Sequence, residues 1–348
     1  MGDRTDPPAS PARPWRGPTI AEIAREAGLG TATIDRVLNG RNSVREVTRK
    51  KVLAAIDRLA GRTGPAAEPP ARRIAFLADS GASFNATLEE AVEASCRARV
   101  DIACTFTGVT TSRVEPPHFA NLIERTAESV EGLIIVARED LMINRAIRNV
   151  VSRRIPVVSL TTDLPTSGRA AYVGSDQTGA GATAAYLMGQ VVGARPGKIL
   201  MFYSAPYRCQ EEREQGFRRV LRSEFAHLDV DERMNSNDDA GLAYRNVVRY
   251  LEEHGAPAGI YNVASGNIGI GRAVREFDLH GKLVFIGHEL NANSRMLLET
   301  GVMTFAIGHD VRLEVDQAID CLTAAIEKRS LPAHPFTRVR IYTKYSCN

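Results

Sequence analysis

The side chains of residues 31–36 form a set that can contact the edges of DNA bases. The outward face of a short predicted helix carries Thr31, Ala32, Thr33, Asp35 and Arg36. An arginine guanidinium can donate two N–H groups to guanine, and a threonine hydroxyl or an alanine methyl can contact bases in the major groove. Asp35 adds an acid, which can accept a hydrogen bond from a cytosine amine or orient Arg36.

The surrounding segment predicts two short helices joined by a tight turn. Apolar residues recur at helical spacing in the first helix, at Ile20, Ile23, Ala24 and Ala27. Gly28-Leu29-Gly30 then interrupts the pattern: Gly28 can adopt the positive φ that ends a helix, and Leu29 can fill the angle between the helices. The second helix is expected to bury Ile34, Val37 and Leu38 and to end at Asn39-Gly40.

A third helix is needed because neither short helix is stable alone. Ser43-x-x-Glu46 is a capping-box pattern, and Val52, Ile56 and Leu59 continue a helical stripe to about Ala60. Two short helices braced by a third are typical of a helix-turn-helix, whose second helix can enter the major groove. The alternative is a small helical packing module with a solvated polar face.

Charge favours the DNA-binding interpretation. Residues 1–73 contain fourteen basic and eight acidic residues, which gives this segment a net charge of +6. The whole chain has a net charge of +3. The remaining 275 residues therefore carry about −3. A basic module joined to a mildly acidic body is the charge distribution expected of a DNA-binding head on a different kind of domain.

The head also resembles a known family. The pattern is Thr19-Ile20-x-x-Ile23-Ala24-x-x-Ala27-Gly28-x-x-x-x-Thr33-Ile34-x-Arg36-Val37-Leu38-Asn39-Gly40, followed by Val44 and Thr48-Arg49-x-x-Val52. It closely resembles the head of LacI/GalR-family transcriptional regulators. The resemblance implies that Thr31, Ala32 and Arg36 read bases, and that Arg45 faces the DNA backbone at a helix start. The whole DNA-binding set expected from it is Thr19, Ile20, Thr31, Ala32, Thr33, Arg36, Asn39, Arg41, Arg45 and Thr48.

The head is flanked by two proline-rich segments. Residues 1–17 are predicted to be a disordered leader and not a signal peptide, residues 18–60 to be the DNA-binding domain, and residues 61–71 to be a linker. Members of the resembled family usually carry Tyr-x-Pro-Asn and a leucine here that enters the minor groove. This linker has no such leucine, so DNA recognition is expected to rest on the major groove. We expect a cytoplasmic protein without a membrane span.

The five cysteines are odd in number and widely spaced in the sequence, at positions 96, 104, 209, 321 and 347. No two of them form a C-x-x-C pair, and no histidine lies at a metal-ligand offset. We therefore expect reduced structural thiols, with no metal and no cofactor.

From Arg72 onward, short apolar strands alternate with helices. Strands are predicted at 74–78, 102–106, 133–136, 156–160, 171–174, 198–203, 259–263, 283–287 and 339–343, and a helix at 86–97. This alternation predicts two-lobed α/β architecture with parallel, doubly wound sheets. Residues 72–348 are then a ligand-binding and dimerisation domain, with lobe one at about 72–162 and 290–325 and lobe two at about 163–289 and 326–348.

Polar residues follow the predicted strands, and ligands of parallel sheets bind at that edge. Amides, carboxylates, an arginine and an aromatic suit a polyhydroxylated ligand. The body resembles the type I periplasmic-binding-protein-like domain of the same family at Tyr172-Val173-Gly174-Ser175-Asp176, Arg213-x-x-Gly216-Phe217 and Ile286-Gly287. By that resemblance Arg213 binds a ligand hydroxyl and Glu289 replaces the usual aspartate. The expected ligand set is Phe84, Asn85, Asp163, Arg213, Asn262, Ser265, Asn267, His288, Glu289 and His309.

Competing interpretations of the body have less support. Gly266, Gly269 and Gly271 could suggest a phosphate loop, but no Gly-Lys-Ser/Thr follows. His288, Glu289, His309 and Asp310 could suggest a metal or acid–base site, but they lie at two different strand ends, and ligand-contact loops explain them equally well. A sugar-binding protein or a sugar-metabolising enzyme would not need the basic head. The sequence therefore predicts a homodimeric, non-enzymatic transcriptional regulator that acts as a repressor. It is expected to bind a pseudo-palindromic DNA operator under control of a sugar, polyol or related metabolite.

Overall fold

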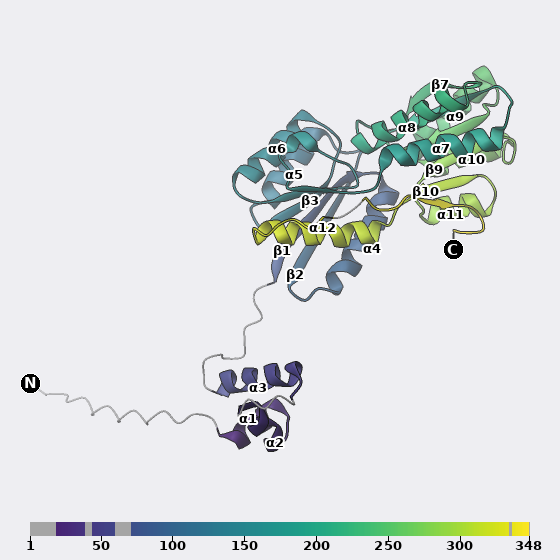
Figure 1. Ribbon diagram of the computed structural model, residues 1–348. Coiled ribbons are helices and arrows are strands. Elements are labelled where there is room, and N and C mark those ends of the chain that lie inside the picture. The colour runs from purple at the N-terminus through teal and green to yellow at the C-terminus, as the bar shows by residue number, and fades with distance from the viewer. Residues whose placement is uncertain (1–18, 39–43, 60–70, 334–335, 348) are drawn as a thin grey trace, which may run out of the picture. The chain divides into compact units, whose positions relative to one another are not determined.

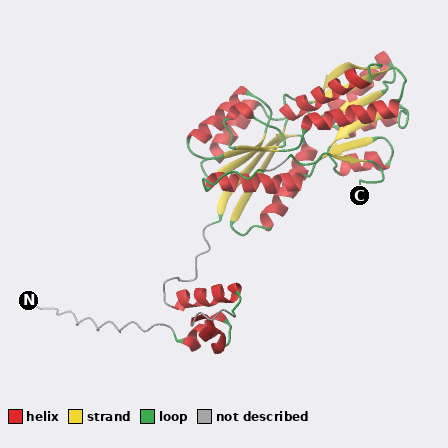
Figure 2. Ribbon diagram, viewed as in Figure 1, coloured by secondary structure: helices red, strands yellow, loops and turns green. Residues whose placement is uncertain are grey.

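The computed structural model describes residues 19–38, 44–59, 71–333 and 336–347. Its chain divides between Pro70 and Ala71 into two compact units, a helical head and an α/β body. Figure 1 labels the helices of both units and several strands of the body. Figure 2 shows that the body's strands are flanked by helices.

The head contains three helices: α1 (Ile20–Ala27), α2 (Thr31–Leu38) and α3 (Glu46–Leu59). Their shared core contains fully buried Ile34, Val52 and Ala55, and Leu29 packs against it from the turn. Outside the core, Arg58 of α3 forms a 2.8 Å ion pair with Glu26 of α1. The three-helix arrangement predicted from the apolar spacing is therefore present.

The ends of the predicted apolar stripes are corrected by the structure. Ile20, Leu38 and Leu59 are 41%, 48% and 39% exposed, although they were expected to face inward. Each of the three is the first or last residue of its helix, whereas the buried residues Val52 and Ala55 stand in the middle of α3. The predicted Ser43 cap and the Asn39-Gly40 helix end lie outside the described residues.

The first lobe of the body contains a parallel sheet in the order β2-β1-β3-β4-β5. Its strands are β1 (Arg72–Ser80), β2 (Ile102–Thr110), β3 (Gly132–Val136), β4 (Val157–Leu160) and β5 (Ala171–Val173). One face is covered by α4 (Ala82–Arg97) and α12 (Val311–Ile326). The other is covered by α5 (Pro116–Thr126) and α6 (Leu141–Ser152). A short 3-10 turn, Pro165–Ser167, precedes β5.

The second lobe contains a sheet in the order β11-β10-β9-β8-β6-β7, in which β11 alone is antiparallel. Its strands are β6 (Gly197–Tyr203), β7 (Leu228–Asn235), β8 (Gly259–Asn262), β9 (Val284–His288), β10 (Phe305–Gly308) and β11 (Arg340–Tyr342). Helices α7 (Gln177–Val192) and α8 (Arg208–Glu224) cover one face. Helices α9 (Ala240–His254), α10 (Asn267–Glu276) and α11 (Ala292–Glu299) cover the other. The predicted fold class is confirmed.

The chain passes between the lobes three times: after β5, after β10 and after α12. Two of these crossing segments meet at a β-bridge between Ser175 and Thr337. This topology corrects the predicted lobe boundaries. Residues 171–173 belong to the first sheet and residues 305–308 to the second, because each strand pairs with the sheet that precedes it in the chain.

Two elements near the predicted ligand region also differ from the sequence interpretation. Helix α4 begins at Ala82, four residues before the predicted start at Ala86, so Phe84 and Asn85 lie on a helix and not on a loop. Strand β7 was not predicted, because alternate residues of this edge strand are exposed and polar. The residues that follow β7 were consequently missed as well.

The expectation that all five cysteines are reduced is wrong for one pair. Cys96 near the end of α4 forms a disulfide with Cys104 of the edge strand β2, with their Cα atoms 6.2 Å apart. The chain turns directly from this helix into the strand, which brings residues eight positions apart together. Cys209, Cys321 and Cys347 are free and buried.

The turn between α1 and α2 gives the first prediction. Gly28 has φ of 60° and ψ of 40°, and a Cβ added there would meet no atom within 4 Å. Substitution Gly28→Ala should therefore cost only the left-handed backbone strain, about 1–2 kcal/mol. Hydrogen exchange of the head amides in the full-length protein measures this loss.

Gly30→Ala is the matched control for this substitution. Gly30 also has open space around its Cα, but it is not in the left-handed region, so alanine should leave the head's stability nearly unchanged. Equal protection factors for the two variants would contradict the proposed role of Gly28 as the helix terminator.

Candidate functional site

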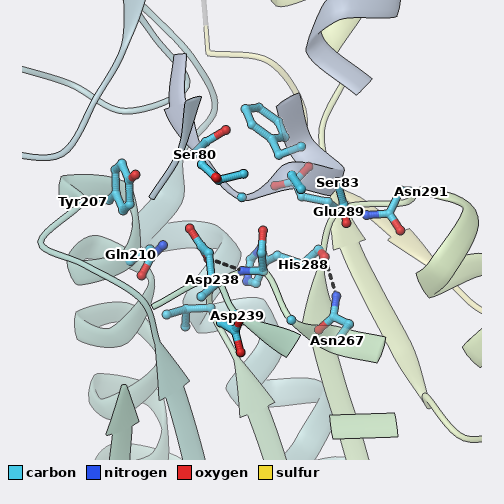
Figure 3. Close-up of a pocket in the computed structure, with 18 of the residues that line it drawn as sticks. Ser80, Ser83, Tyr207, Gln210, Asp238, Asp239, Asn267, His288, Glu289 and Asn291 are labelled. Atoms are coloured by element: carbon cyan, nitrogen blue, oxygen red, sulfur yellow. Dashed lines mark hydrogen bonds between the residues drawn. The ribbon is translucent and has the colours of Figure 1, made fainter. Parts of the chain in front are cut away.

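A cavity of about 380 Å³ lies between the two lobes, at the carboxyl ends of their strands. This volume is within the range of small-molecule sites. Lobe one contributes the turn that begins α4, and lobe two contributes the start of α8 and the loops after β7, β8 and β9. Figure 3 shows Ser80 and Ser83 on one side of the cavity, with Asp238 and Asp239 on the other.

Arg213 is held rigidly at the base of this cavity. It is buried on α8, where its Nε donates to Gln177 Oε1 at 2.7 Å and its Nη1 to the Val263 carbonyl at 3.1 Å. Helices α7 and α8 can approach each other closely because Gly181 and Gly216 have no side chain at the contact. A Cβ added at Gly181 would lie 1.8 Å from the Arg213 carbonyl oxygen, and one at Gly216 would lie 2.0 Å from the Thr178 carbonyl oxygen. The Arg-x-x-Gly pattern therefore fixes the arginine against its neighbour helix.

Glu289 connects the cavity to the hinge between the lobes. Its Oε1 accepts from Arg213 Nη2 at 3.4 Å, and its Oε2 lies 3.3 Å from His309 Nε2. His309 stands on the crossing segment after β10, and its Nδ1 lies 2.8 Å from Glu314 Oε1 on α12. The histidine N–H groups are not aligned with these oxygens as in regular hydrogen bonds, so attraction between charges holds the contacts.

The charges in this chain of contacts shift one another's protonation. Burial alone would lower the pKa of His309, but the carboxylates of Glu314 and Glu289 raise that pKa well above 6.5. Burial would raise the pKa of Glu289, but His309 and Arg213 lower it below the ordinary value. Burial lowers the pKa of His288 well below 6.5, so this cavity residue is neutral. Glu289 and His309 therefore form a charged pair at neutral pH.

Glu314 also accepts hydrogen bonds from a residue that follows β4 of the first lobe and from a residue of the third crossing segment. It accepts from the Thr161 hydroxyl at 3.3 Å and from the Thr337 hydroxyl. The contacts of Arg213, Glu289, His309 and Glu314 thus run from the ligand cavity through the hinge into lobe one. Any ligand that moves Glu289 changes the environment of the hinge histidine.

Three residues that line the cavity have unusual backbone conformations. Thr161, Asp238 and Glu289 have φ of 62°, 53° and 67°, values that residues with a Cβ rarely adopt. Such strain persists where surrounding contacts enforce it and often occurs at binding sites.

The lobes also touch at the outer edge of the cavity. Asp238 of lobe two accepts from the Thr111 hydroxyl of lobe one at 3.1 Å and from the Ser265 N–H at 2.9 Å. The Tyr207 hydroxyl of lobe two donates to the Asp79 carbonyl at 2.7 Å, and Arg138 holds the Asp79 carboxylate with two bonds of 2.6 and 2.9 Å. The bonds from Asp238 to Thr111 and from Tyr207 to Asp79 join the two lobes over the cavity.

Six residues of the predicted ligand set line this cavity: Phe84, Arg213, Ser265, Asn267, His288 and Glu289. Two others support the lining without joining it. Asn262 donates to the Ser265 carbonyl and to Asn267 Oδ1, and His309 lies behind Glu289. Sequence alone does not separate residues that face a cavity from residues that brace it.

Asn85 and Asp163 do not line the cavity, contrary to expectation. Asn85 donates to the Ser80 and Val109 carbonyls, because α4 begins early enough to turn this amide toward β1 and β2. Asp163 is paired with Arg169, which lowers the pKa of the carboxyl although burial opposes that shift. Both side chains are occupied by structural contacts.

Several cavity residues were missed from the predicted set. They are Ser80, Ser83, Thr110, Ser112, Arg113, Thr161, Thr162, Tyr207, Gln210, Asp238, Asp239, Asn291 and Asn293. Helical spacing could have identified Gln210, which precedes Arg213 by three residues on the same helix. Asp238 and Asp239 escaped because the strand before them was not predicted.

The head has a separate candidate surface on α2. Thr31, Ala32 and Arg36 are exposed, while Thr33 is half-buried. Thr19 caps α1: its hydroxyl accepts from the Glu22 N–H at 3.3 Å, in a capping box. Among the other predicted DNA contacts, Ile20 and Arg45 are exposed and Thr48 is half-buried. Asn39 and Arg41 lie outside the described residues.

Comparison with known proteins identifies both units. Residues 19–60 match the family described as bacterial regulatory proteins, lacI family, and residues 74–330 match the periplasmic binding protein domain. The chain belongs to the periplasmic binding protein domain family and carries a LacI-family head. This confirms the resemblance inferred from the two sets of motifs.

The similar curated proteins are bacterial regulators. The chain is 61% identical over 41 residues to catabolite control protein A of Streptococcus mutans. It is 51% identical over 41 residues to the transcriptional repressor PurR of Photobacterium profundum. Each match covers 12% of this chain and 12% of the relative.

The similar solved structures include a named glucose-galactose binding protein and a solute binding protein with a bound sugar. GanP, a glucose-galactose binding protein from Geobacillus stearothermophilus, superposes with a TM-score of 0.72 at 19% identity, over 79% of this chain and 98% of that one. A solute binding protein from Agrobacterium vitis with bound D-fucose gives 0.72 at 22% identity, over 78% and 96%. At these identities the likeness establishes only the fold of the body.

Within the described part of this LacI-family chain, every helix is too short or too polar to cross a lipid bilayer.

The buried ion pairs of His309 give a pH prediction. A histidine whose pKa is raised by folding stabilises the protein fully below its unfolded pKa and loses this contribution as pH rises through the folded value. The melting temperature of the wild type should therefore exceed that of His309→Gln most at about pH 6, and the difference should shrink at alkaline pH. Calorimetry of the full-length protein across this range measures it.

His280→Gln is the control for general loss of a histidine, because His280 is exposed. Its stability difference from the wild type should be small at every pH. A difference between wild type and His309→Gln that does not change with pH would contradict the charged state assigned to His309.

Proposed function

We propose that the chain is a sequence-specific DNA-binding transcriptional regulator, acting as a repressor, whose operator binding is controlled by a small polyhydroxylated ligand in the cleft. One observation carries the proposal. A head with an exposed reading helix is joined to a two-lobed body with a ligand-sized cavity at its hinge. Relatives that match the head are named as transcriptional regulators and repressors.

The proposed DNA-reading surface is the exposed side of α2. Arg36 is free to extend from the last turn of this helix, and Thr31 and Ala32 lie near its start. Small residues permit close approach to the bases, and arginine can form a bidentate pair with guanine. Exposed Arg45 at the start of α3 is suited to a phosphate contact, which positions the head without reading sequence.

The proposed ligand is a sugar, polyol or related metabolite. The cavity offers hydroxyl, amide and carboxylate groups for hydrogen bonds to hydroxyls, and Phe84 supplies an aromatic face. The fold relatives named as glucose-galactose and D-fucose binding proteins support the same ligand class.

We further propose a cytoplasmic homodimer that binds a pseudo-palindromic operator. A single head covers little DNA surface, so two heads on symmetric half-sites are needed for tight binding. The body is the proposed source of the dimer contact, with α4 contributing to it. Ligand binding would act through Glu289 on the hinge residue His309 and so change the angle between the lobes.

The competing functions are a stand-alone sugar-binding protein and a sugar-metabolising enzyme. The head distinguishes the regulator from both, because neither competing function uses an exposed DNA-reading helix. The cavity's charged groups also have structural partners: Arg213 with Glu289, and Asp238 with Thr111 and Ser265.

Arg36→Ala tests the reading role of α2. With an operator obtained by selection from random DNA, the substitution should cost about 1–3 kcal/mol of binding free energy and relax the preference at one base position. Fluorescence anisotropy on a panel of single-base variants measures both effects. Arg25→Ala, exposed on α1, serves as control and should change affinity evenly across the panel. An equal loss on every sequence for Arg36→Ala would make Arg36 a phosphate contact.

Arg213→Lys tests the ligand role of the cavity. Lysine keeps the positive charge beside Glu289 but cannot serve Gln177, Val263 and a ligand together. DNA binding without ligand should be unchanged, while ligand affinity should fall by about 1.5–3 kcal/mol. Titration of the operator complex with ligand measures the response. Arg222→Lys, exposed on the same helix, should retain it. An unchanged response in Arg213→Lys would remove this residue from the site.

A further inference from the structure

Charged groups are distributed unevenly around the cavity. The lining contains three carboxylates, Asp238, Asp239 and Glu289, and two arginines, Arg113 and Arg213. Arg113 is exposed at the rim, whereas Arg213 is buried beside the base. Arg213 is therefore the cation that a ligand in the interior would meet.

The charge of Arg213 is already balanced. Glu289 lies 3.4 Å from one guanidinium nitrogen, and the Val263 carbonyl and Gln177 take two further N–H groups. The second oxygen of Glu289 faces His309, whose own charge is shared with Glu314. These four side chains, three of them buried and Glu289 half-buried, carry two positive and two negative charges, so the base of the cavity offers hydrogen bonds without an excess positive charge.

The charge of Asp238, in contrast, is not balanced by an oppositely charged side chain among the described residues. Its two oxygens accept from uncharged donors, the Thr111 hydroxyl and the Ser265 N–H, and no cation within the described residues forms an ion pair with it. Burial raises the pKa of Asp238, which reflects the cost of its charge in this position. A second anion brought into the cavity would face this carboxylate across a partly desolvated space.

We propose that the cleft selects uncharged polyhydroxylated ligands and rejects those with a carboxylate or phosphate, with Glu289 as the residue that sets this selectivity. The inference rests on the proposed ligand-binding function of the same cavity. Glu289 neutralises the arginine that would otherwise attract an anion, and its carboxylate can still accept bonds from ligand hydroxyls. The remaining N–H groups of Arg213 donate to hydroxyl oxygens.

The experiment uses the full-length protein and probe sets that differ in charge. Each set contains a neutral sugar, its aldonate and its phosphate ester: D-glucose, D-gluconate and D-glucose 6-phosphate, and the equivalent galactose and arabinose compounds. Thermal shift identifies stabilising members, and calorimetry gives their affinities. The neutral member of at least one set should stabilise the wild type, and its charged counterparts should bind about tenfold or more weakly.

Glu289→Gln should reverse this order. The variant leaves Arg213 with an unbalanced charge, so affinity for the aldonate should rise while affinity for the neutral sugar falls. Glu299→Gln, exposed on α11, is the matched control and should keep the wild-type order. If Glu289→Gln fails to fold by circular dichroism, Asp238→Asn supplies the test, because removing that carboxylate should raise aldonate affinity and retain neutral-sugar binding.

An aldonate or phosphate ester that binds the wild type as tightly as its neutral partner would overturn the selectivity while leaving a ligand-controlled regulator intact. Failure of every neutral probe to stabilise the wild type would overturn it too. The regulatory function is judged separately, by sequence-specific DNA binding through Arg36.

Discussion

The ion pair between Glu289 and His309 is the interaction that connects the ligand cavity to the hinge between the lobes. Glu289 reaches the ligand cavity, and His309 occupies a segment that crosses between the lobes. A charge in this position is costly without a partner, so Arg213 and Glu314 are needed at the two ends. Arg213 and Glu289 therefore line the base of the cavity, His309 and Glu314 brace the hinge, and the ion pairs between them couple the cavity to the hinge.

Much of the fold could be predicted from sequence because its signals are local. Apolar strands alternating with helices gave the two parallel sheets, and Gly28 marked the turn in the head. The Arg-x-x-Gly spacing around Arg213 was informative for the same reason, since Gly216 must lie against the facing helix. Strand β7 gave no such signal, because an edge strand exposed on alternate residues resembles a polar loop.

The site was harder to predict because facing direction is a tertiary property. His309 and Glu289 both follow parallel strands, yet one braces the hinge and the other lines the cavity. Asn85 appeared to be on a loop until the earlier start of α4 turned it inward. The disulfide between Cys96 and Cys104 depends on how a helix returns to its sheet, which cysteine spacing does not reveal.

The return of α12 to the first lobe has a consequence for synthesis on the ribosome. Val315, Ile319 and Leu322 complete the core beneath β1 and β4, but they follow the whole strand framework of the second lobe except β11. At about 5–20 residues per second, roughly seven to thirty seconds of synthesis separate the end of β5 from the start of this helix. During that interval the sheet face that α4 covers lacks its second helix, and the apolar surface left exposed on the nascent first lobe favours aggregation or chaperone binding.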